Sequence, residues 1–150
     1  MKFIMMIGVP GSGKSTYCQN YLKQFPHAVW LSSDAMRLKL FGTEEYQKDN
    51  AKVFQALEEE VLATLKSGKD VLYDCTNLIK ANRDKICQQV RKIPDVSIEA
   101  VVFKLPLWIC LKHNKERERT VPEKVIRRMH RSAEWPKVDE GFQKVRWFYR

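Results

Sequence analysis

A glycine-rich run near the start of the chain holds the residues whose spacing points most directly to chemistry. It reads Gly8-Val9-Pro10-Gly11-Ser12-Gly13-Lys14-Ser15 and matches the pattern G-x-x-x-x-G-K-[ST]. Glycines here let backbone N–H groups turn inward around a polyphosphate, and a helix starting at the loop adds its partial positive charge. In such a loop Lys14 neutralises charge on the β- and γ-phosphates, and the Ser15 hydroxyl ligates Mg²⁺. The sequence therefore predicts a site for ATP and Mg²⁺, made by Gly11, Ser12, Gly13, Lys14, Ser15 and Thr16.

Other positions favour phosphoryl transfer to an acceptor over hydrolysis. A GTPase needs a guanine-reading N-K-x-D sequence, and the nearest candidate has Arg117 where the aspartate belongs. Motor-type ATPases carry an Asp-Glu pair at the end of an apolar strand, whereas here Asp74 is followed by Cys75. Both hydrolytic interpretations therefore lack their defining residue.

Asp34 and Arg37 form a candidate acceptor site. They follow the second short apolar run, and a spacing of three places them on one face of a helix. A carboxylate here can accept the proton of an attacking hydroxyl, and the guanidinium can hold an anionic group of the acceptor. The alternative is a helix-capping aspartate beside a surface arginine. The neighbouring P-loop favours the functional interpretation.

Asp74 ends the third apolar run, and two interpretations of it stay open. In the structural interpretation, Asp74 or Asn77 caps the helix that follows. In the functional one, the Asp74 carboxylate fixes Arg37 or orders Mg²⁺ through water.

The basic residues are concentrated in the second part of the chain. Residues 76–150 supply the whole net charge of +9, and Lys112–Arg131 alone holds eight basic and three acidic residues. Arginines over a nucleotide site form a lid that spreads charge away from the transferring phosphoryl group. Arg117 and Arg119 are the candidates, within a lid segment over residues 112–135. The alternative is the solvated face of a basic helix.

Apolar runs alternate with helical patterns along the chain. Strands are expected at residues 2–7, 28–31, 70–74, 96–105 and 144–149. Helices are expected at residues 14–25, 44–66, 78–92, 107–116 and 122–133, with caps at Ser32–Asp34, Thr43 and Gly68 and a first-turn proline at Pro122. Strands that alternate with helices imply a parallel sheet covered on both faces, and such sheets bind ligands at the carboxyl ends of their strands.

Length and composition fit one soluble domain over residues 1–150. The chain is 44% hydrophobic and 30% charged, and no apolar run is long enough to span a membrane. Its apolar opening lacks a signal-peptide cleavage site and predicts a buried strand. Four cysteines lie far apart without a C-x-x-C pair, which argues against zinc and disulfides and for a reducing, cytoplasmic location.

Four motifs together resemble the kinase domain of polynucleotide 5′-hydroxyl kinases, the phage and bacterial end-healing enzymes. In chain order they are GVPGSGKST, D-x-x-R after the second strand, D-x-T-N after the third, and an arginine-containing segment leading into V-P-x-x-V-I-x-R-M. The resemblance spans residues 3–148. It implies an α/β fold of the P-loop kinase type, with a parallel sheet flanked by helices on both faces and a helical, arginine-bearing lid.

The resemblance also implies a reaction and a role for each site residue. The γ-phosphate of ATP would be transferred to the 5′-hydroxyl end of RNA or DNA. Asp34 would be the general base, Arg37 would grip the phosphate of the terminal nucleotide, and Asp74 would support Arg37. Arg117 and Arg119 would be lid arginines on the phosphates of ATP.

Two features depart from the family pattern, and two other functions stay open. The lid loop is slightly shorter than in the phage enzyme, and Cys75 separates the aspartate from Thr-Asn. Without an attached phosphatase or ligase module, end healing implies partners on separate chains. The alternatives are a kinase for a nucleoside, sugar or antibiotic, and a non-catalytic nucleotide-dependent switch. Net charge and Arg37 favour the polymer, and a switch has no need of the acceptor base Asp34.

Overall fold

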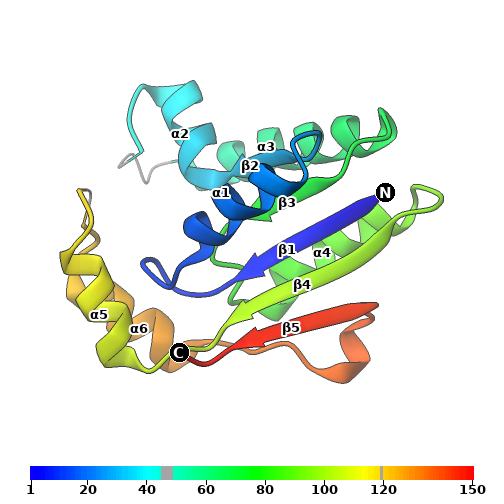
Figure 1. Ribbon diagram of the computed structural model, residues 1–150. Helices are drawn as coiled ribbons and strands as arrows, with labels where there is room; N and C mark the ends of the chain where they lie inside the picture. Colours follow the sequence, from blue (N-terminus) through cyan, green and yellow to red (C-terminus); the bar gives the residue numbers. More distant parts are fainter. Residues whose placement is uncertain (45–48, 119) are drawn as a thin grey trace.

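A sheet of parallel strands forms the centre of the computed structural model, which describes residues 1–44, 49–118 and 120–150 (Figure 1). The strands are β1 (Lys2–Ile7), β2 (Val29–Ser32), β3 (Val71–Asp74), β4 (Ser97–Phe103) and β5 (Lys144–Phe148). Their order across the sheet is β2-β3-β1-β4-β5, and each neighbouring pair is parallel. The predicted parallel α/β architecture is confirmed. Because parallel strands end at one edge, the residues after β1, β2 and β3 meet there.

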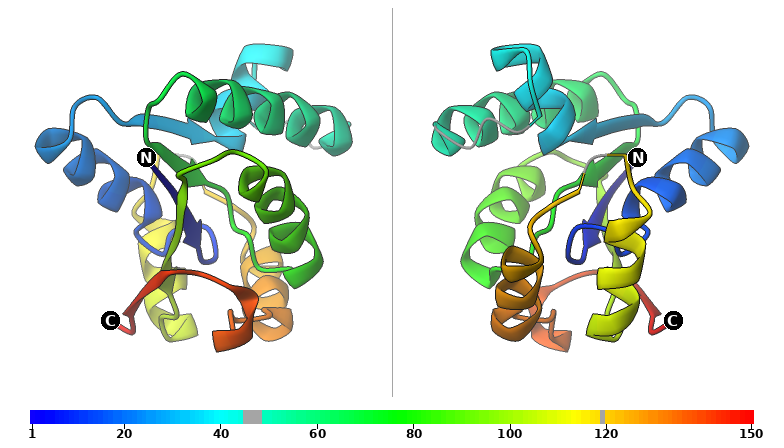
Figure 2. Two further views of the ribbon diagram at one scale, coloured as in Figure 1. Left: turned by 90° about the vertical axis from the view of Figure 1, so that its right-hand side faces the viewer. Right: turned by 90° about the vertical axis from the view of Figure 1, so that its left-hand side faces the viewer.

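Helices cover both faces of this sheet. They are α1 (Lys14–Gln24), α2 (Ser33–Phe41), α3 (Asn50–Lys66), α4 (Lys80–Arg91), α5 (Leu107–Lys115), α6 (Glu123–Ser132) and the short 3-10 helix η1 (Val138–Glu140). The side views show α1 on one face and α3 and α4 on the other (Figure 2). Helices α5 and α6 lie toward the edge to which the strand arrowheads point (Figure 1). Across the described ranges, no helix is both long and apolar enough to cross a lipid bilayer.

The core consists of two layers because β1 is buried on both faces. Phe3 and Met5 point into the larger cluster, together with a stripe of α3 formed by Val53, Leu57, Val61 and Leu65. The alternate residues Ile4 and Met6 point into a smaller cluster with Cys18 of α1. This alternation follows from the two-residue period of a strand, and burial on both sides explains why β1 reads as one continuous apolar run.

The segment between β2 and β3 differs from the sequence-based expectation. The predicted helix over residues 44–66, with Thr43 as its cap, begins instead at Asn50, and a separate helix α2 precedes it. The apolar stripe behind the prediction starts only at Val53, so the pattern did not constrain the first turns. Residues 45–48 lie outside the described ranges.

The other predicted helix boundaries agree closely with the structure. Ser32 caps α2, since its hydroxyl accepts a hydrogen bond from the Ala35 N–H at 3.0 Å. Pro122 was predicted in the first turn of its helix, and in the structure it is the residue immediately before α6. The 3-10 helix η1 was not predicted. Glu140 of η1 pairs with Arg83 of α4.

Candidate active site

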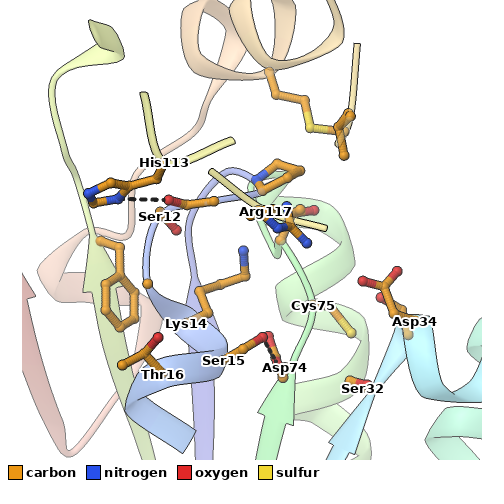
Figure 3. Close-up of a pocket in the computed structure, with 18 of the residues that line it drawn as sticks. Ser12, Lys14, Ser15, Thr16, Ser32, Asp34, Asp74, Cys75, His113 and Arg117 are labelled. Atoms are coloured by element: carbon orange, nitrogen blue, oxygen red, sulfur yellow. Dashed lines mark hydrogen bonds between the residues drawn. The ribbon is translucent and has the colours of Figure 1, made fainter. Parts of the chain in front are cut away.

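A cleft of about 1730 Å³ opens at the carboxyl edge of the sheet (Figure 3). It is lined by the P-loop after β1, the start of α2, the turn after β3, and the α5–α6 segment. Phe103 and Phe148 from the ends of β4 and β5 complete the wall. A single small ligand fills roughly 300–1,000 Å³, so this cleft has room for two substrates side by side.

The P-loop backbone adopts conformations that require glycine. Gly11 and Gly13 have φ angles of 81° and 103°, in the left-handed region that side chains with a Cβ disfavour. At Gly8, a Cβ would lie 2.6 Å from the Ser12 hydroxyl oxygen. That hydroxyl is buried and has no hydrogen-bond partner within the described residues, so a phosphate oxygen is a fitting partner. The six predicted loop residues, 11–16, all line the cleft.

Lys14 is buried at the start of α1 and turned toward the loop. Its Nζ donates hydrogen bonds to the carbonyl oxygens of Gly8 and Val9, at 3.0 and 2.9 Å. Burial lowers the pKa of Lys14 from its ordinary value, the Asp74 carboxylate opposes that shift, and the Arg117 guanidinium adds to it. A polyphosphate placed here would favour the charged ammonium.

Asp74 contacts the P-loop helix and β2. One of its carboxylate oxygens, Oδ2, accepts hydrogen bonds from the Ser15 hydroxyl at 3.3 Å and from the Trp30 indole N–H at 2.9 Å. Figure 3 shows the Ser15 and Asp74 side chains pointing at each other. This arrangement fits the interpretation in which Asp74 orders Mg²⁺. A hydroxyl and a carboxylate are oxygen ligands of the kind Mg²⁺ prefers, and such sites keep several waters. Ser15 and Asp74 are therefore the residues that would hold the metal.

Arg37 has other partners than the resemblance implies. Its Nη1 lies 3.2 Å from the Asp34 carboxylate and its Nη2 donates to the Asn50 side-chain oxygen at 3.3 Å. Asp34 and Asn50 line the cleft, whereas the Arg37 side chain is 10% exposed and is not part of the lining. Asp34 and Arg37 are thus brought together as predicted from their spacing. The hydrogen bonds of Asp74 go to Ser15 and Trp30, so support of Arg37 by Asp74 stays a prediction.

The segment predicted as a lid contacts the P-loop through α5. The His113 ring nitrogen Nδ1 lies 3.1 Å from the Gly11 carbonyl oxygen. Asn114 is buried and exchanges two hydrogen bonds with the backbone of Val121, at 2.7 and 2.9 Å, which closes the loop between α5 and α6. Arg117 in this loop lines the cleft, and its Nη1 is buried with no hydrogen-bond partner among the described residues. The other predicted lid arginine, Arg119, lies outside the described residues.

Sequence patterns missed several residues that shape the site. The sequence patterns gave no role to Trp30, Asn50 or Asn114. Arg83 is the largest omission. It is 1% exposed and pairs with Glu140 of η1 through two hydrogen bonds of 3.0 and 2.8 Å. Its Nη1 also donates to the carbonyl of Asn77 in the turn after β3. An arginine in a helical pattern is expected to be solvent-exposed, so only the fold reveals that Arg83 is buried and paired.

Comparison with known proteins gives the family. Residues 3–136 match the AAA_33 family, described as an AAA domain, and the chain belongs to that family. With the P-loop, the parallel sheet and the cleft, this membership defines a P-loop domain with a kinase-type fold.

Two curated relatives share more than a quarter of their aligned residues with this chain. The transcription factor bHLH140 of Arabidopsis thaliana is 29% identical over 97% of this chain and 16% of its own length. The L-seryl-tRNA(Sec) kinase of Methanococcus maripaludis is 27% identical over 89% of this chain and 52% of its own length. The chain thus spans about half or less of the relatives it matches.

Solved structures share the fold at lower identity. A chain of the Pnkp1/Rnl/Hen1 RNA repair complex superposes with a TM-score of 0.75 at 23% identity, covering 87% of this chain and 43% of that one. A fungal RNA kinase gives 0.71 at 17% identity, covering 97% and 72%. A gluconokinase from Sinorhizobium meliloti gives 0.67 at 16% identity, covering 97% and 81%.

Proposed function

We propose that this protein is a polynucleotide 5′-hydroxyl kinase, which converts ATP and a 5′-hydroxyl end of RNA or DNA into ADP and a 5′-phosphate end. The observation that carries the proposal is the Asp34–Arg37 pair on α2, whose Asp34 lines the same cleft as Lys14 and Ser15. A carboxylate and a guanidinium at this edge suit an acceptor that offers both a hydroxyl and an anionic group.

The proposed step uses Lys14, Ser15, Asp34, Asp74 and Arg117, which all line the cleft, together with Arg119. The acceptor oxygen attacks the γ-phosphorus, and the bond from that phosphorus to the β–γ bridging oxygen breaks, so ADP leaves. Asp34 takes the proton of the attacking hydroxyl. Lys14 and the lid arginines Arg117 and Arg119 neutralise charge on the transferring group. Mg²⁺, held by Ser15 with Asp74 through water, would shield the phosphate oxygens.

Charge and relatives support a nucleic-acid acceptor. The net charge of +9 comes from residues 76–150, and Arg117, Arg128 and Arg150 from this part line the cleft. A phosphate polymer is attracted to such a surface. The names of an RNA repair complex, an RNA kinase and a tRNA-directed kinase among similar proteins agree with this acceptor class. Partners in end healing would be separate phosphatase or ligase proteins.

A kinase for a small molecule is the second candidate. A gluconokinase shares the fold of this chain with a TM-score of 0.67, so the same scaffold also serves a small acceptor. The lid arginines serve ATP in either case and do not separate the two functions.

Terminally labelled ATP separates the candidates directly. The protein is incubated with 5′-hydroxyl RNA and DNA oligonucleotides, and in parallel with nucleosides, gluconate and aminoglycosides. We expect label on the oligonucleotides and little on the small acceptors. Efficient labelling of a small acceptor alone would establish the second candidate, and transfer to no acceptor would favour a nucleotide-dependent switch.

Salt dependence provides a further discriminator. For single strands, log affinity falls by about 0.7 per phosphate contact for each unit of log salt, so KM for an oligonucleotide should rise steeply with salt. A KM that ignores salt would contradict a polymer substrate.

A further inference from the structure

Two arginine–carboxylate pairs of this chain differ sharply in burial. In the Arg83–Glu140 pair the side chains are 1% and 2% exposed, and two hydrogen bonds join them. In the Arg37–Asp34 pair they are 10% and 41% exposed, with a contact of 3.2 Å. Removing one partner of a fully buried pair leaves an uncompensated buried charge, whereas a pair with one solvent-exposed partner is held more weakly. Arg83 is therefore fixed, and Arg37 can exchange its partner.

The Arg37 guanidinium still has a donor to offer. Its Nη1 is engaged by Asp34 and its Nη2 by Asn50. Its Nε is buried and has no hydrogen-bond partner within the described part of the chain. A buried donor without a partner is unfavourable, so an anion that accepts from Nε relieves that cost. The planar fork of a guanidinium matches two oxygens of one phosphate.

Asp34 has two tasks that compete. In the structure one of its oxygens faces the Arg37 guanidinium, and the proposed reaction needs this carboxylate to take the proton of the acceptor hydroxyl. A carboxylate oxygen that accepts a hydrogen bond from a guanidinium has one lone pair fewer to offer the acceptor hydroxyl. Asn50, which reaches Arg37 from α3, helps to hold the guanidinium in this position.

We propose that Arg37 is a latch on Asp34, held in place by Asn50, and that an anionic group of the acceptor opens it. A phosphate beside the acceptor hydroxyl draws the guanidinium toward itself, and the Asp34 oxygen that faced Arg37 can then accept the proton of the hydroxyl. Phosphate recognition and base activation become one event. This inference rests on the proposed function and deepens it: the phosphate raises kcat as well as tightening binding. Asn50 is a positioning residue in this scheme.

The test divides the acceptor into two pieces. A nucleoside and its 3′-phosphate are compared as acceptors at saturating ATP and Mg²⁺, and the nucleoside is also assayed with added sodium phosphite. We expect phosphite to raise kcat for the nucleoside in the wild-type protein. In Arg37→Ala, phosphite should have no effect, the phosphorylated acceptor should lose its advantage, and the nucleoside should react about fivefold faster than in wild type, the equivalent of ~1 kcal/mol.

Two further variants sharpen the result. Asn50→Ala should raise nucleoside turnover in the same direction by loosening Arg37. Because Asn50 is exposed, this variant keeps the test available if loss of the buried Arg37 prevents folding. Lys39→Ala removes an exposed charge from the same helix, and its phosphite response should equal that of the wild type.

The outcomes separate the latch from the function beneath it. Nucleoside turnover in Arg37→Ala and Asn50→Ala that stays at or below the wild-type rate would make Arg37 a binding residue only and overturn the latch. A phosphite effect that persists without Arg37 would also overturn it. The 5′-hydroxyl kinase remains the proposed function under both results if the wild type phosphorylates the 5′-hydroxyl of the nucleoside 3′-phosphate. Transfer to neither acceptor nor to an oligonucleotide would end both proposals.

Discussion

Lys14 shows how much the environment of one side chain contributes to this site. Its ammonium is buried, and its two carbonyl contacts hold it inside the P-loop. Because burial lowers its pKa, the charge depends on neighbouring anions, of which Asp74 is the strongest in the structure. A polyphosphate would add more negative charge at the same place.

We expect Lys14→Ala to fold and to lose nearly all phosphoryl transfer. The ammonium is the group fixed next to the proposed β- and γ-phosphates, where its removal costs several kcal/mol of transition-state stabilisation. Activity is measured with labelled ATP, and Lys23→Ala, an exposed lysine near the end of the same helix, is the control. Retention of more than about a tenth of the rate, a loss of only ~1.4 kcal/mol, would contradict the P-loop assignment.

Asp34→Asn separates a kinase from a protein that only binds nucleotide. Asparagine keeps the size of the side chain but cannot take a proton, so kcat should fall by about 10²–10⁴-fold, the typical cost of losing a general base. KM for both substrates should change little. Thermal melting with and without ATP and Mg²⁺ is the control, and the variant should still be stabilised. Wild-type turnover in Asp34→Asn would reduce the residue to a structural role on α2.

At the level of elements, two hydrogen bonds of Asn114 shape the segment that we propose as a lid. Asn114 joins α5 to Val121 at the start of the next segment, and this closure positions Arg117 in the cleft wall. The unpartnered Nη1 of Arg117 is the donor that a phosphate oxygen would satisfy.

Replacing the lid arginines should therefore affect turnover more than binding. We expect Arg117→Ala to lower kcat more than it raises the dissociation constant for ATP, because a lid contact forms fully only in the closed state. One of Arg117 and Arg119 should be nearly dispensable. Single-turnover rates and nucleotide titrations of both variants measure this. Full activity in both would assign the segment to a solvated helix face.

The buried Arg83–Glu140 pair should govern stability rather than chemistry. Arg83 joins α4, the turn after β3 and η1, and its loss leaves Glu140 buried without its cation. Arg83→Ala should lower the free energy of unfolding by about 3–5 kcal/mol, measured by urea denaturation. Lys80→Ala breaks the exposed pair with Asp84 on the same helix and should leave stability nearly unchanged. A small effect at Arg83 would mean that water replaces its partners.

At the scale of the whole molecule, the four cysteines are buried and free, and they make the stability of the fold depend on alkaline pH. Burial raises the pKa of Cys75 to about 12 and that of Cys87 to about 11. An unfolded thiol has a pKa near 8.5, so above that pH the folded chain binds more protons than the unfolded chain. The contribution of these thiols to the free energy of unfolding is therefore fully present below pH ~8.5. It should be lost as the pH rises from there toward ~12.

Urea denaturation at a series of pH values checks this slope, and Cys75→Ala should reduce it. The same burial predicts slow labelling of all four thiols by a disulfide reagent at pH 8 in the native state, since the thiolate is the reactive form. Rapid native-state labelling of any thiol would show that the core around it opens.

The sequence alone determined the architecture and the position of the P-loop. Alternating apolar runs and helical patterns fix a parallel sheet, because each signal is local and has its own period. The glycines, Lys14 and Ser15 belong to one continuous loop and the start of α1, so their spacing in the sequence is enough to predict how they lie together. The residues after β2 and β3 were also foreseeable, since parallel strands end at a shared edge.

Only the tertiary structure decided the partners of these residues. That Arg37 also reaches Asn50, that Asp74 meets Ser15 and Trp30, and that Arg83 is buried against Glu140 all depend on contacts between elements that are separate in the sequence. A single sequence carries no signal for such contacts, because a polar side chain looks the same in a surface helix as in a buried pair. Burial and distance are properties of the folded chain, and they determine which charges of this site are fixed and which can move.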